Sequence, residues 1–366
     1  MNQRVPELRL EHVTKRFGST AAVQDVSFCL WPGEFLSLLG PSGCGKTTTL
    51  RMIAGFVVPD AGRILCRGQD ITDEPPYRRD VGLVFQNYAL FPHMTVAENV
   101  AFGLKMRGAA RSVTRDRVQW ALELVRMPQY GTRRPHELSG GQQQRVAVAR
   151  VLAAGASLLL FDEPFSNLDA KLRKAMQVEL RELQQRLGIA TIHVTHDQQE
   201  AMSMSDRLIV MNSGQIEQEG TPEEIYRHPR SAFVAEFMGE CNRLAGRVVG
   251  VDRARGMAEL DLDAGGRLLA PWSGPEDPPE RAVAFLRPEH ITIVSSGAGG
   301  GQANVLAGTV RRRVYLGPVT VLYVSLNDDT DVLVQCTNSL NGASGYGPDA
   351  RVQLHLPPPS VRLMPL

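Results

Sequence analysis

The sequence has almost no excess charge and no long hydrophobic run. Its 366 residues include 40 Lys and Arg against 39 Asp and Glu, a formal net charge of +1. Proteins that hold nucleic acid through bulk charge carry a clear excess of basic residues, so no nucleic-acid partner is expected. The longest uncharged stretch, residues 291–310, is rich in Ser, Gly, Gln and Asn. A membrane-spanning helix needs roughly 20 mainly apolar residues in a row, so none is expected.

Cysteine is scarce, and its spacing excludes two further kinds of site. The five cysteines contain no C-x-x-C pair, which argues against a zinc site and against a disulfide framework. Apart from Cys44, they are expected to be small buried hydrophobic residues. The first ten residues contain charged side chains, and no apolar signal-peptide core follows them. The chain is therefore expected to remain in the cytosol.

Hydrophobic residues make up 43% of the chain, which is sufficient for packed cores. At about 100–200 residues per domain, the length predicts two or three domains. Residues 1–236 alternate short apolar runs with helix-like segments. Strands are expected at 34–40, 157–161 and 189–195, and helices at 46–56 and 170–188. This alternation predicts an α/β fold with a parallel sheet covered on both faces.

The composition changes near Gly239, where helix-like periodicity fades. Short β-type runs occur after it, separated by breaks rich in glycine or proline, such as 297–301 and 357–359. The expected strands are 281–286, 319–326, 331–335 and 351–356. The sequence therefore predicts that residues 237–366 form a small all-β, barrel-like domain, similar to an OB fold.

The segment Gly40-Pro-Ser-Gly-Cys-Gly-Lys46-Thr47 matches the phosphate-binding loop G-x-x-x-x-G-K-[ST]. It follows an expected strand and opens an expected helix, whose N-terminal amides would face an anion. Lys46 is expected to reach the β- and γ-phosphates and Thr47 to bind Mg²⁺. Cys44 lies at a helix start, a position that favours reactive cysteines, so nucleotide is expected to protect it from alkylation. The residues predicted to contact ATP here are Gly40, Pro41, Ser42, Gly43, Cys44, Gly45, Lys46, Thr47 and Thr48.

Two carboxylates follow the apolar run 157–161. Asp162, at a strand tip, suits the magnesium shell of a nucleotide. Glu163 is then placed to orient a water for attack on the γ-phosphate. Alone, an acidic pair after a strand is usually an ordinary solvated turn. Beside a phosphate-binding loop, the catalytic interpretation is preferred.

A second anion-binding helix start is predicted at Leu138-Ser139-Gly140-Gly141-Gln142. Ser139 is a good helix N-cap, and a helical run follows at 142–152. One ATP at the first loop leaves this second end without a ligand. A head-to-tail homodimer resolves this, because each ATP then lies between Lys46 of one copy and Ser139, Gly140 and Gly141 of the other.

Together these motifs resemble the ATP-binding subunit of an ABC transporter, with 138–142 as the family signature. The resemblance implies a P-loop NTPase domain with a helical subdomain at about 87–155. It also implies that Gln86 senses Mg²⁺ and water, that His196 contacts the γ-phosphate, and that the 166–169 loop, with Asp169, crosses the dimer interface. Phe17 resembles the aromatic that stacks on adenine, although a core aromatic is the alternative.

The resemblance continues into the second domain through Leu286-Arg-Pro-Glu-His-Ile291, which looks like the accessory TOBE-like domain of importer ATPases. Within these importers, residues 233–242 look most like the polyamine branch, for spermidine and putrescine. Ferric iron and 2-aminoethylphosphonate remain alternatives. The resemblance implies two transmembrane permease subunits as partners, an extracytoplasmic solute-binding protein as an indirect one, and a peripheral location at the cytoplasmic face of the inner membrane.

Other interpretations stay open on the sequence. The segment 86–100 could dock a partner helix through Tyr88, Leu90 and Phe91, or these side chains could fill the core of the helical subdomain. An ABC ATPase acting on DNA or ribosomes would usually carry two ATP-binding halves or a long coiled coil, and neither is seen. A nucleotide kinase would leave the second anion site unexplained. The β-domain could also bind a regulator.

Overall fold

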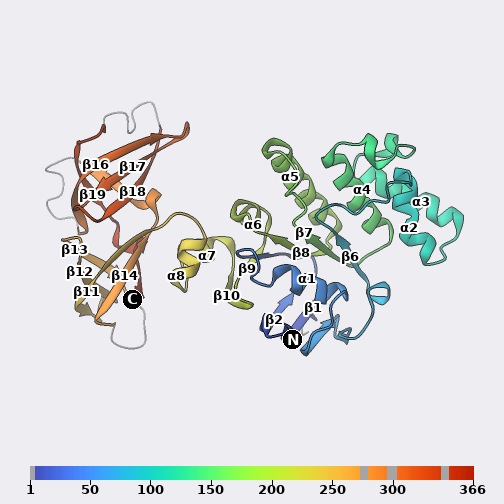
Figure 1. Ribbon diagram of the computed structural model, residues 1–366, viewed down its shortest axis with the longest axis horizontal. Coiled ribbons are helices and arrows are strands. Elements are labelled where there is room, and N and C mark those ends of the chain that lie inside the picture. Colours follow the sequence, from blue (N-terminus) through green and yellow to red (C-terminus); the bar gives the residue numbers. More distant parts are fainter. Residues whose placement is uncertain (1–4, 273–278, 295–302, 339–345) are drawn as a thin grey trace. The chain divides into compact units, whose positions relative to one another are not determined.

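The computed structural model describes residues 5–272, 279–294, 303–338 and 346–366, which form two compact units (Figure 1). The units divide between Ile225 and Tyr226. The predicted glycine-rich break at 297–301 lies outside the described residues. An α/β unit followed by an all-β unit is the architecture that the sequence predicts.

The first unit is built on a six-stranded sheet in the order β10-β9-β3-β8-β7-β6. All neighbouring strands run parallel except β10, which pairs antiparallel with β9. The strands are β3 (Phe35–Leu39), β6 (Val81–Val84), β7 (Leu158–Asp162), β8 (Ala190–Thr195), β9 (Arg207–Asn212) and β10 (Gln215–Gly220). The three strands expected from sequence are β3, β7 and β8, which confirms the parallel sheet.

Both faces of this sheet are buried, which is why its strands are continuous apolar runs. Along β7, Leu159 and Phe161 pack into a core with the helices of one face, while Leu158 and Leu160 pack into a second core on the other. Burying one such side chain stabilises the fold by about 1.5–3 kcal/mol. The helices of the first unit are α1 (Lys46–Ala54), α2 (Val96–Met106), α3 (Arg111–Leu124), α4 (Gly140–Ala153), α5 (Ala170–Leu187) and α6 (Gln198–Met204).

A four-stranded antiparallel sheet, in the order β2-β1-β4-β5, completes the second core and was not predicted. Its strands are β1 (Leu8–Phe17), β2 (Thr20–Leu30), β4 (Ala61–Cys66) and β5 (Gln69–Asp70). The pairing of β1 with β2 shifts register several times. These bulges interrupt the alternation of inward and outward residues by which a half-buried strand is identified in a sequence.

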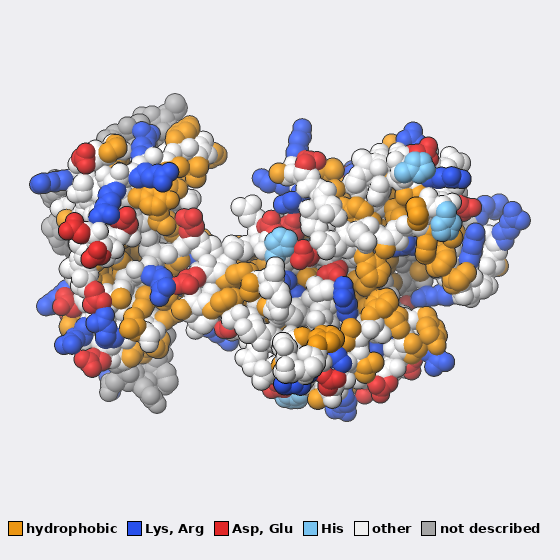
Figure 2. Space-filling model, viewed as in Figure 1, with side chains coloured by type: hydrophobic (Ala, Val, Ile, Leu, Met, Phe, Trp, Pro, Cys, Tyr) orange, Lys and Arg blue, Asp and Glu red, His pale blue; other side chains and the backbone are white. Residues whose placement is uncertain are grey.

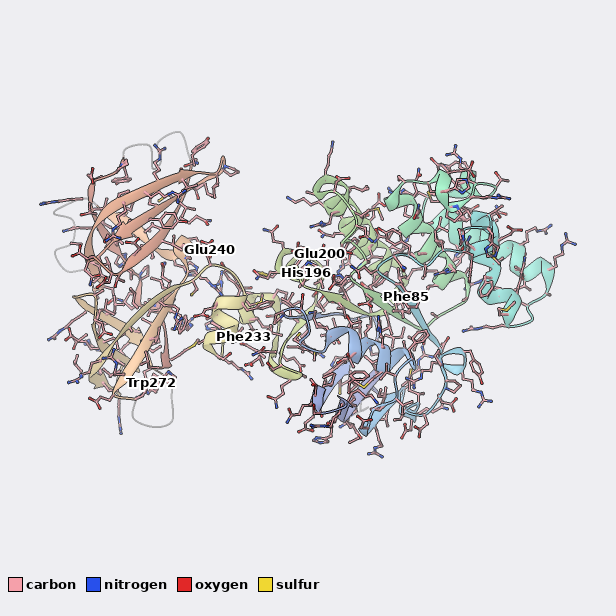
Figure 3. All side chains as sticks on the ribbon, viewed as in Figure 1. Phe85, His196, Glu200, Phe233, Glu240 and Trp272 are labelled. Carbon is pink, nitrogen blue, oxygen red and sulfur yellow. The ribbon has the colours of Figure 1, made fainter. Side chains whose placement is uncertain are left out.

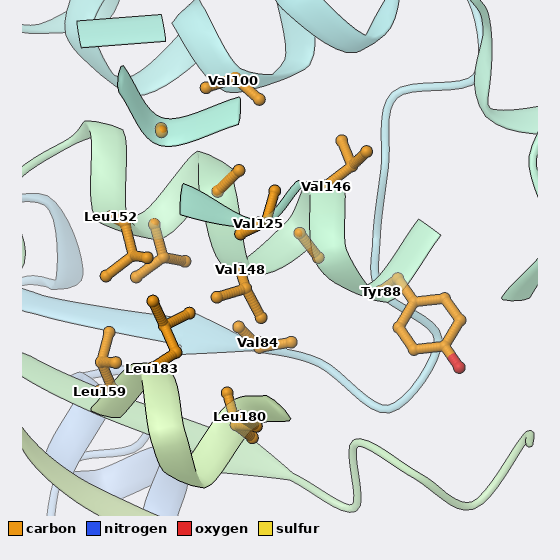
Figure 4. Close-up of a cluster of buried hydrophobic side chains, with 14 of the residues drawn as sticks. Val84, Tyr88, Val100, Val125, Val146, Val148, Leu152, Leu159, Leu180 and Leu183 are labelled. Atoms are coloured by element: carbon orange, nitrogen blue, oxygen red, sulfur yellow. The ribbon is translucent and has the colours of Figure 1, made fainter. Parts of the chain in front are cut away.

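Helices α2, α3 and α4 form the helical subdomain predicted at about 87–155. Their apolar faces share a core with β6, in which Val100, Leu122, Val148 and Val84 are buried (Figure 4). Helix α4 starts at Ser139, whose hydroxyl accepts from the Gln142 amide. The N-cap predicted at Ser139 is confirmed.

The second unit has two five-stranded antiparallel sheets, β13-β12-β11-β14-β20 and β15-β19-β16-β17-β18. Residues of both sheets, such as Leu260 and Leu322, share one core. The strands are β11 (Asn242–Asp252), β12 (Met257–Leu262), β13 (Arg267–Pro271), β14 (Arg281–Leu286), β15 (Thr292–Val294), β16 (Val305–Tyr315), β17 (Val319–Ser325), β18 (Asp331–Thr337), β19 (Arg351–His355) and β20 (Arg362–Pro365). All four strands expected from sequence are present.

The division into units precedes the boundary predicted at 236 because a short helix belongs to the β-domain. Besides α7 (Pro222–Arg227), the chain forms α8 (Ala232–Phe237), whose Ala235 packs with Phe285 of β14. Arg287 is buried, and its guanidinium donates to the carbonyls of Ala235 (2.8 Å) and Gly239 (3.0 Å). These contacts attach residues before the predicted boundary to the second unit.

Acidic and basic side chains are interspersed over the face of each unit shown in Figure 2. On this face, neither sign of charge gathers in one region of either unit. Within the described ranges, no helix combines the length and the apolar character needed to cross a bilayer.

Candidate functional site

The loop from Gly40 to Thr48 joins β3 to α1 and is held tightly by its glycines. Gly43 and Gly45 have φ of 81° and 106°, in the left-handed region where side chains with a Cβ are disfavoured. A Cβ at Gly40 would lie 2.2 Å from the Met211 carbonyl oxygen, and one at Gly45 would lie 2.4 Å from that of Ala22. Glycine is therefore required for this backbone to pass so close to its neighbours.

The first turn of α1 points its free amides into the same loop. Gly45, at the N-cap, provides no side-chain cap, and no acidic residue lies in the first turn. Lys46 is 5% exposed, and its Nζ donates to the carbonyls of Gly40 (2.7 Å) and Pro41 (2.9 Å). A buried ammonium and uncapped helix amides together make a site for an anion.

Thr47 and Asp162 meet at the carboxyl end of the parallel sheet. The Thr47 hydroxyl donates to Asp162 Oδ1 at 3.2 Å. Asp162 is 8% exposed, and burial raises its pKa, with the Thr47 hydrogen bond opposing this shift. A hydroxyl and a buried carboxylate are the oxygen donors that Mg²⁺ prefers, so these two residues fit a magnesium ion beside the phosphate loop.

Glu163, the next residue, has an unusual backbone and a histidine partner. Its φ is 47°, a left-handed conformation that a non-glycine residue adopts at a cost, and such strain concentrates at functional sites. Its carboxylate Oε2 lies 3.0 Å from His196 Nδ1. Both side chains line a cavity of about 70 Å³, as does Glu200 (Figure 3 labels His196 and Glu200). The structure thus brings together two predicted catalytic residues that are 33 positions apart in the sequence.

Polar residues lie close to this pair, several of them lining the same cavity, and sequence reasoning missed most of them. His193 is fully buried, which lowers its pKa to about 3, and its Nδ1 lies 3.1 Å from the Ser37 hydroxyl. The Thr195 hydroxyl donates to Glu200 at 2.8 Å, and Arg173 Nε lies 3.8 Å from Glu200. Burial raises the pKa of Glu200. Polar residues of this kind carry no linear spacing by which they could be found in the sequence.

Gln86 lies next to the loop that follows Glu163. Its Nε2 donates to the Ser166 hydroxyl at 3.2 Å, and its carbonyl accepts from Asn167 Nδ2 at 3.0 Å. The Ser166 hydroxyl in turn donates to the Glu163 carbonyl at 3.0 Å. Gln86, the loop expected to cross the dimer interface and Glu163 are therefore connected by hydrogen bonds.

The signature segment is satisfied within its own copy of the chain. Ser139 and Gln142 form a reciprocal capping box, with the Ser139 amide donating to Gln142 Oε1 at 2.9 Å. A Cβ at Gly141 would lie 3.1 Å from the Leu172 side chain, so this glycine allows α4 to approach α5 closely. No hydrogen bond of the described residues joins Ser139–Gln142 to the 40–48 loop. One copy of the chain does not assemble the two anion-binding ends into one site.

Two further predicted contact residues have clear positions. Phe17 is 55% exposed at the end of β1, with Lys15 Nζ 5.6 Å from its ring centre, so the alternative of a core aromatic is wrong. Asp169 caps α5, accepting from the amides of Lys171 (3.1 Å) and Leu172 (3.0 Å). Its carboxylate therefore already has a structural role at the loop that was expected to cross the dimer interface.

The burial of Tyr88 and Cys44 bears on two of the predictions, and for Tyr88 it favours the alternative of a core residue. Tyr88 is 4% exposed and belongs to the helical-subdomain core (Figure 4), so it is not an exposed docking side chain. Leu90 packs against that core, and the Phe91 ring lies 4.4 Å from that of Phe102. Cys44 is 2% exposed, so its sulfur is buried in this conformation. Its protection from alkylation by nucleotide stays a prediction.

Comparisons with known proteins agree with this geometry. Residues 23–166 match the family model described as ABC transporter, and residues 284–364 match the TOBE domain model. The chain is 48% identical to the spermidine/putrescine import ATP-binding protein PotA of Pseudomonas aeruginosa, over 93% of each chain. It is 49% identical to the Fe(3+) ions import ATP-binding protein FbpC 1 of Rhizobium meliloti, over 84% of each chain.

A solved structure resembles the first unit. It is a dimeric, post-hydrolysis state of an ATP-binding cassette with ADP and phosphate bound, with 32% sequence identity and a TM-score of 0.52. The similarity covers 59% of this chain and 98% of that one. The first unit therefore has the fold of a cassette that has been captured with the products of ATP hydrolysis.

Proposed function

Because the chain belongs to the ABC transporter family of ATP-binding subunits, we propose that it powers the import of a polyamine such as spermidine or putrescine. The activity of the family, ATP hydrolysis in the service of import, belongs to this chain. The observation that carries the substrate is the 48% identity with a spermidine/putrescine import protein, which extends through both domains over 93% of each chain.

Lys46 and the first turn of α1 bind the phosphates of ATP in this proposal. In the free chain the Lys46 ammonium is held by the carbonyls of Gly40 and Pro41. A phosphate oxygen offers a stronger, charge-assisted hydrogen bond, so Lys46 exchanges these partners when ATP binds. The uncapped amides of α1 add their dipoles at the same place. Phe17, which is exposed, is available to stack on the adenine ring.

Thr47 and Asp162 would hold Mg²⁺, with Gln86 close to the same end of the site. When bound, Mg²⁺ neutralises charge on the β- and γ-phosphate oxygens. The role of Thr47 and Asp162 would then be to fix the position of the ion.

Glu163 orients the attacking water and His196 contacts the γ-phosphate. The water oxygen forms a bond to the γ-phosphorus while the bond to the bridging oxygen breaks, which gives ADP and inorganic phosphate. The hydrogen bond of 3.0 Å between Glu163 and His196 fixes both side chains. The left-handed backbone of Glu163 sets the direction in which its carboxylate leaves the strand.

Two copies of the chain close around the nucleotides, with Ser139, Gly140 and Gly141 of one copy facing the ATP that Lys46 of the other binds. This proposal rests on the lack of any hydrogen bond between the two ends among the described residues, and on the dimeric state of the similar cassette. Closure and reopening would be transmitted to two transmembrane permease subunits. The chain would then lie peripherally at the cytoplasmic face of the inner membrane.

A transport assay tests the substrate. The gene for this chain is deleted in its own cell, and uptake of labelled putrescine, spermidine and ferric iron is measured. We expect polyamine uptake to fall and to return with the parent chain but not with Lys46→Ala. Exposed Lys174→Ala serves as the control variant and should restore uptake. Unchanged polyamine uptake would contradict the proposal.

Ferric iron is the second candidate because of one observation, the 49% identity with an iron import protein over 84% of each chain. The same assay separates the two solutes. A loss of iron uptake alone would reassign the substrate and leave the ATPase chemistry unchanged. The TOBE domain match at 284–364 disfavours an ABC ATPase that acts on DNA or ribosomes.

A further inference from the structure

The turn that follows Gln86 has a disfavoured backbone. Tyr88 and Ala89 have φ of 62° and 47°, two consecutive left-handed residues, and neither is glycine. In this region a Cβ crowds the neighbouring carbonyl oxygen. The turn is closed by hydrogen bonds from the Tyr88 amide to the Phe85 carbonyl (2.9 Å) and from the Ala89 amide to the Asn87 carbonyl (2.7 Å). Such a conformation persists only where the surroundings hold it.

Arg150, in the last turn of α4, supplies that support. Its Nη1 donates to the Ala89 carbonyl at 2.7 Å, and its Nη2 donates to the Tyr88 carbonyl at 3.1 Å. The guanidinium carbon also lies 5.7 Å from the centre of the Phe91 ring. The planar fork of arginine fits two adjacent carbonyls, which the single ammonium of lysine does not match. Burial lowers the pKa of Arg150.

The turn at Tyr88–Ala89 and the helix that carries Arg150 each adjoin a segment with a proposed function. Upstream of the turn, Gln86 is bonded to Ser166 (3.2 Å) and Asn167 (3.0 Å), in the loop after Glu163. Helix α4, which carries Arg150, begins at the signature glycine Gly140. Arg150 therefore joins the helix that follows the signature to the turn that follows Gln86.

We propose that Arg150 is a positioning residue for ATP hydrolysis, which holds the left-handed turn at Tyr88–Ala89 and thereby keeps Gln86 at the Glu163 end of the site. The role rests on the function proposed for Gln86. Because Arg150 is part of α4, a movement of the signature end of this helix also changes the position of Gln86. Nucleotide binding at the 40–48 loop does not involve this contact.

The first test compares Arg150→Met with Arg117→Met in the full-length chain. Arg117 is a matched control, since it also donates to two carbonyls, those of Leu152 (3.1 Å) and Ala153 (3.3 Å), and lies 4.3 Å from the Trp120 ring. We expect Arg150→Met to lower the kcat for ATP by about 10- to 100-fold while KM changes less than about threefold. Arg117→Met should leave kcat within about twofold. Equal kcat losses in the two variants would overturn the proposal.

A second variant keeps the test decisive if Arg150→Met folds poorly. Glycine adopts left-handed φ without the Cβ penalty, so Ala89→Gly should lessen the need for Arg150. We expect the double variant to recover at least about threefold in kcat over Arg150→Met. Arg150→Lys, which offers one donor centre, should fall between the parent and Arg150→Met in kcat and serves alone if the methionine variant is insoluble. A lysine variant with parental kcat, or a glycine variant with no recovery, would contradict the mechanism.

Gln86→Ala separates this inference from the proposed function. If Gln86→Ala keeps the parental kcat, the role proposed for Gln86 fails, and the inference fails with it. If Gln86→Ala loses kcat while Arg150→Met behaves like Arg117→Met, only the role of Arg150 is wrong. Loss of kcat in both, with ATP affinity retained, is the expected result.

Discussion

The N-termini of α1 and α4 both resemble anion sites, but only that of α4 is capped by side chains. The α1 end has no side-chain cap and contains the buried Lys46, whose ammonium donates to loop carbonyls and to the Cys44 sulfur. The α4 end is closed by the capping box of Ser139 and Gln142. The same feature of secondary structure, a glycine-rich helix start, is therefore left open in one place and satisfied in the other.

This difference indicates which end needs a ligand in the free chain. Uncapped amides and an ammonium held by weak neutral acceptors gain most from an arriving phosphate. A capped helix end already has partners for its amides, so it is stable without a ligand. It can therefore be exposed until a second copy of the chain brings a nucleotide to it. We therefore expect a two-step order, in which ATP binds at α1 first and closure over α4 follows.

The largest expected effect is that of Glu163→Gln. This variant should leave the N-termini of α1 and α4 intact but stop ATP hydrolysis. We expect kcat to fall by about 1,000-fold, because an amide orients water but does not accept its proton as a carboxylate does. ATP affinity should change little, and an ATP-dependent dimer should accumulate on gel filtration. Exposed Glu182→Gln is the control. Parental turnover by Glu163→Gln would remove Glu163 from the mechanism.

Ser139→Arg is expected to disturb the N-terminus of α4 and to leave that of α1 unchanged. Its bulk and charge should prevent closure and lower kcat by about 100-fold, while ATP binding by a single chain stays within about twofold. Thr95→Arg is a matched control, because Thr95 and Glu98 form the same kind of capping box at α2. In the isolated chain the two variants should lose similar stability, about 1 kcal/mol for the cap. An ATP-dependent dimer of Ser139→Arg would contradict the arrangement between two copies.

Lys46→Ala tests the open end. Loss of a charge-assisted hydrogen bond to phosphate should raise the Kd for ATP by about 10- to 100-fold, measured by calorimetry on the isolated chain. Turnover should also be lost, since the γ-phosphate is no longer neutralised. Lys174→Ala should bind ATP like the parent. Unchanged affinity in Lys46→Ala would show that the α1 end is not the nucleotide site.

The smallest expected effect concerns pH and Asp162. Burial raises the pKa of Asp162, so the folded chain binds this proton more tightly than the unfolded chain. Its contribution to the free energy of unfolding is therefore most favourable below the ordinary aspartate pKa and is lost as pH rises through the raised value. Asp162→Asn should remove this dependence and be slightly more stable at neutral pH, while Mg²⁺-dependent ATP binding weakens. Denaturant unfolding of both proteins at several pH values without Mg²⁺ checks the direction of this pH dependence. A loss of stability in Asp162→Asn at neutral pH would contradict the prediction.

Prediction succeeded where one segment contains all of its own determinants. The loop at 40–48 and the cap at Ser139 are local, because glycine conformations and helix caps are decided within a few residues. The strands β3, β7 and β8 were visible because burial on both faces makes them uninterrupted apolar runs. The antiparallel sheet was missed because the bulges of β1 disturb its alternation.

Tyr88 shows the limit of local reasoning about exposure. Its neighbours Leu90 and Phe91 are also apolar, and a run of this kind suits an interface as well as a core. Packing with the core residues of α2, α3 and α4 makes Tyr88 a core residue, with 4% of its surface exposed. Its left-handed backbone, supported from Arg150, cannot be read from composition either.

The sequence by itself determined the identity of the phosphate loop, the paired carboxylates at the end of β7, and the existence of two anion-type helix starts. Only the tertiary structure brought Glu163 to His196, Gln86 to Ser166 and Arg150 to the turn at Tyr88–Ala89. The physical reason is range. Turn, cap and strand preferences act between residues close in the chain, whereas hydrogen bonds between distant segments depend on how the sheet and helices pack.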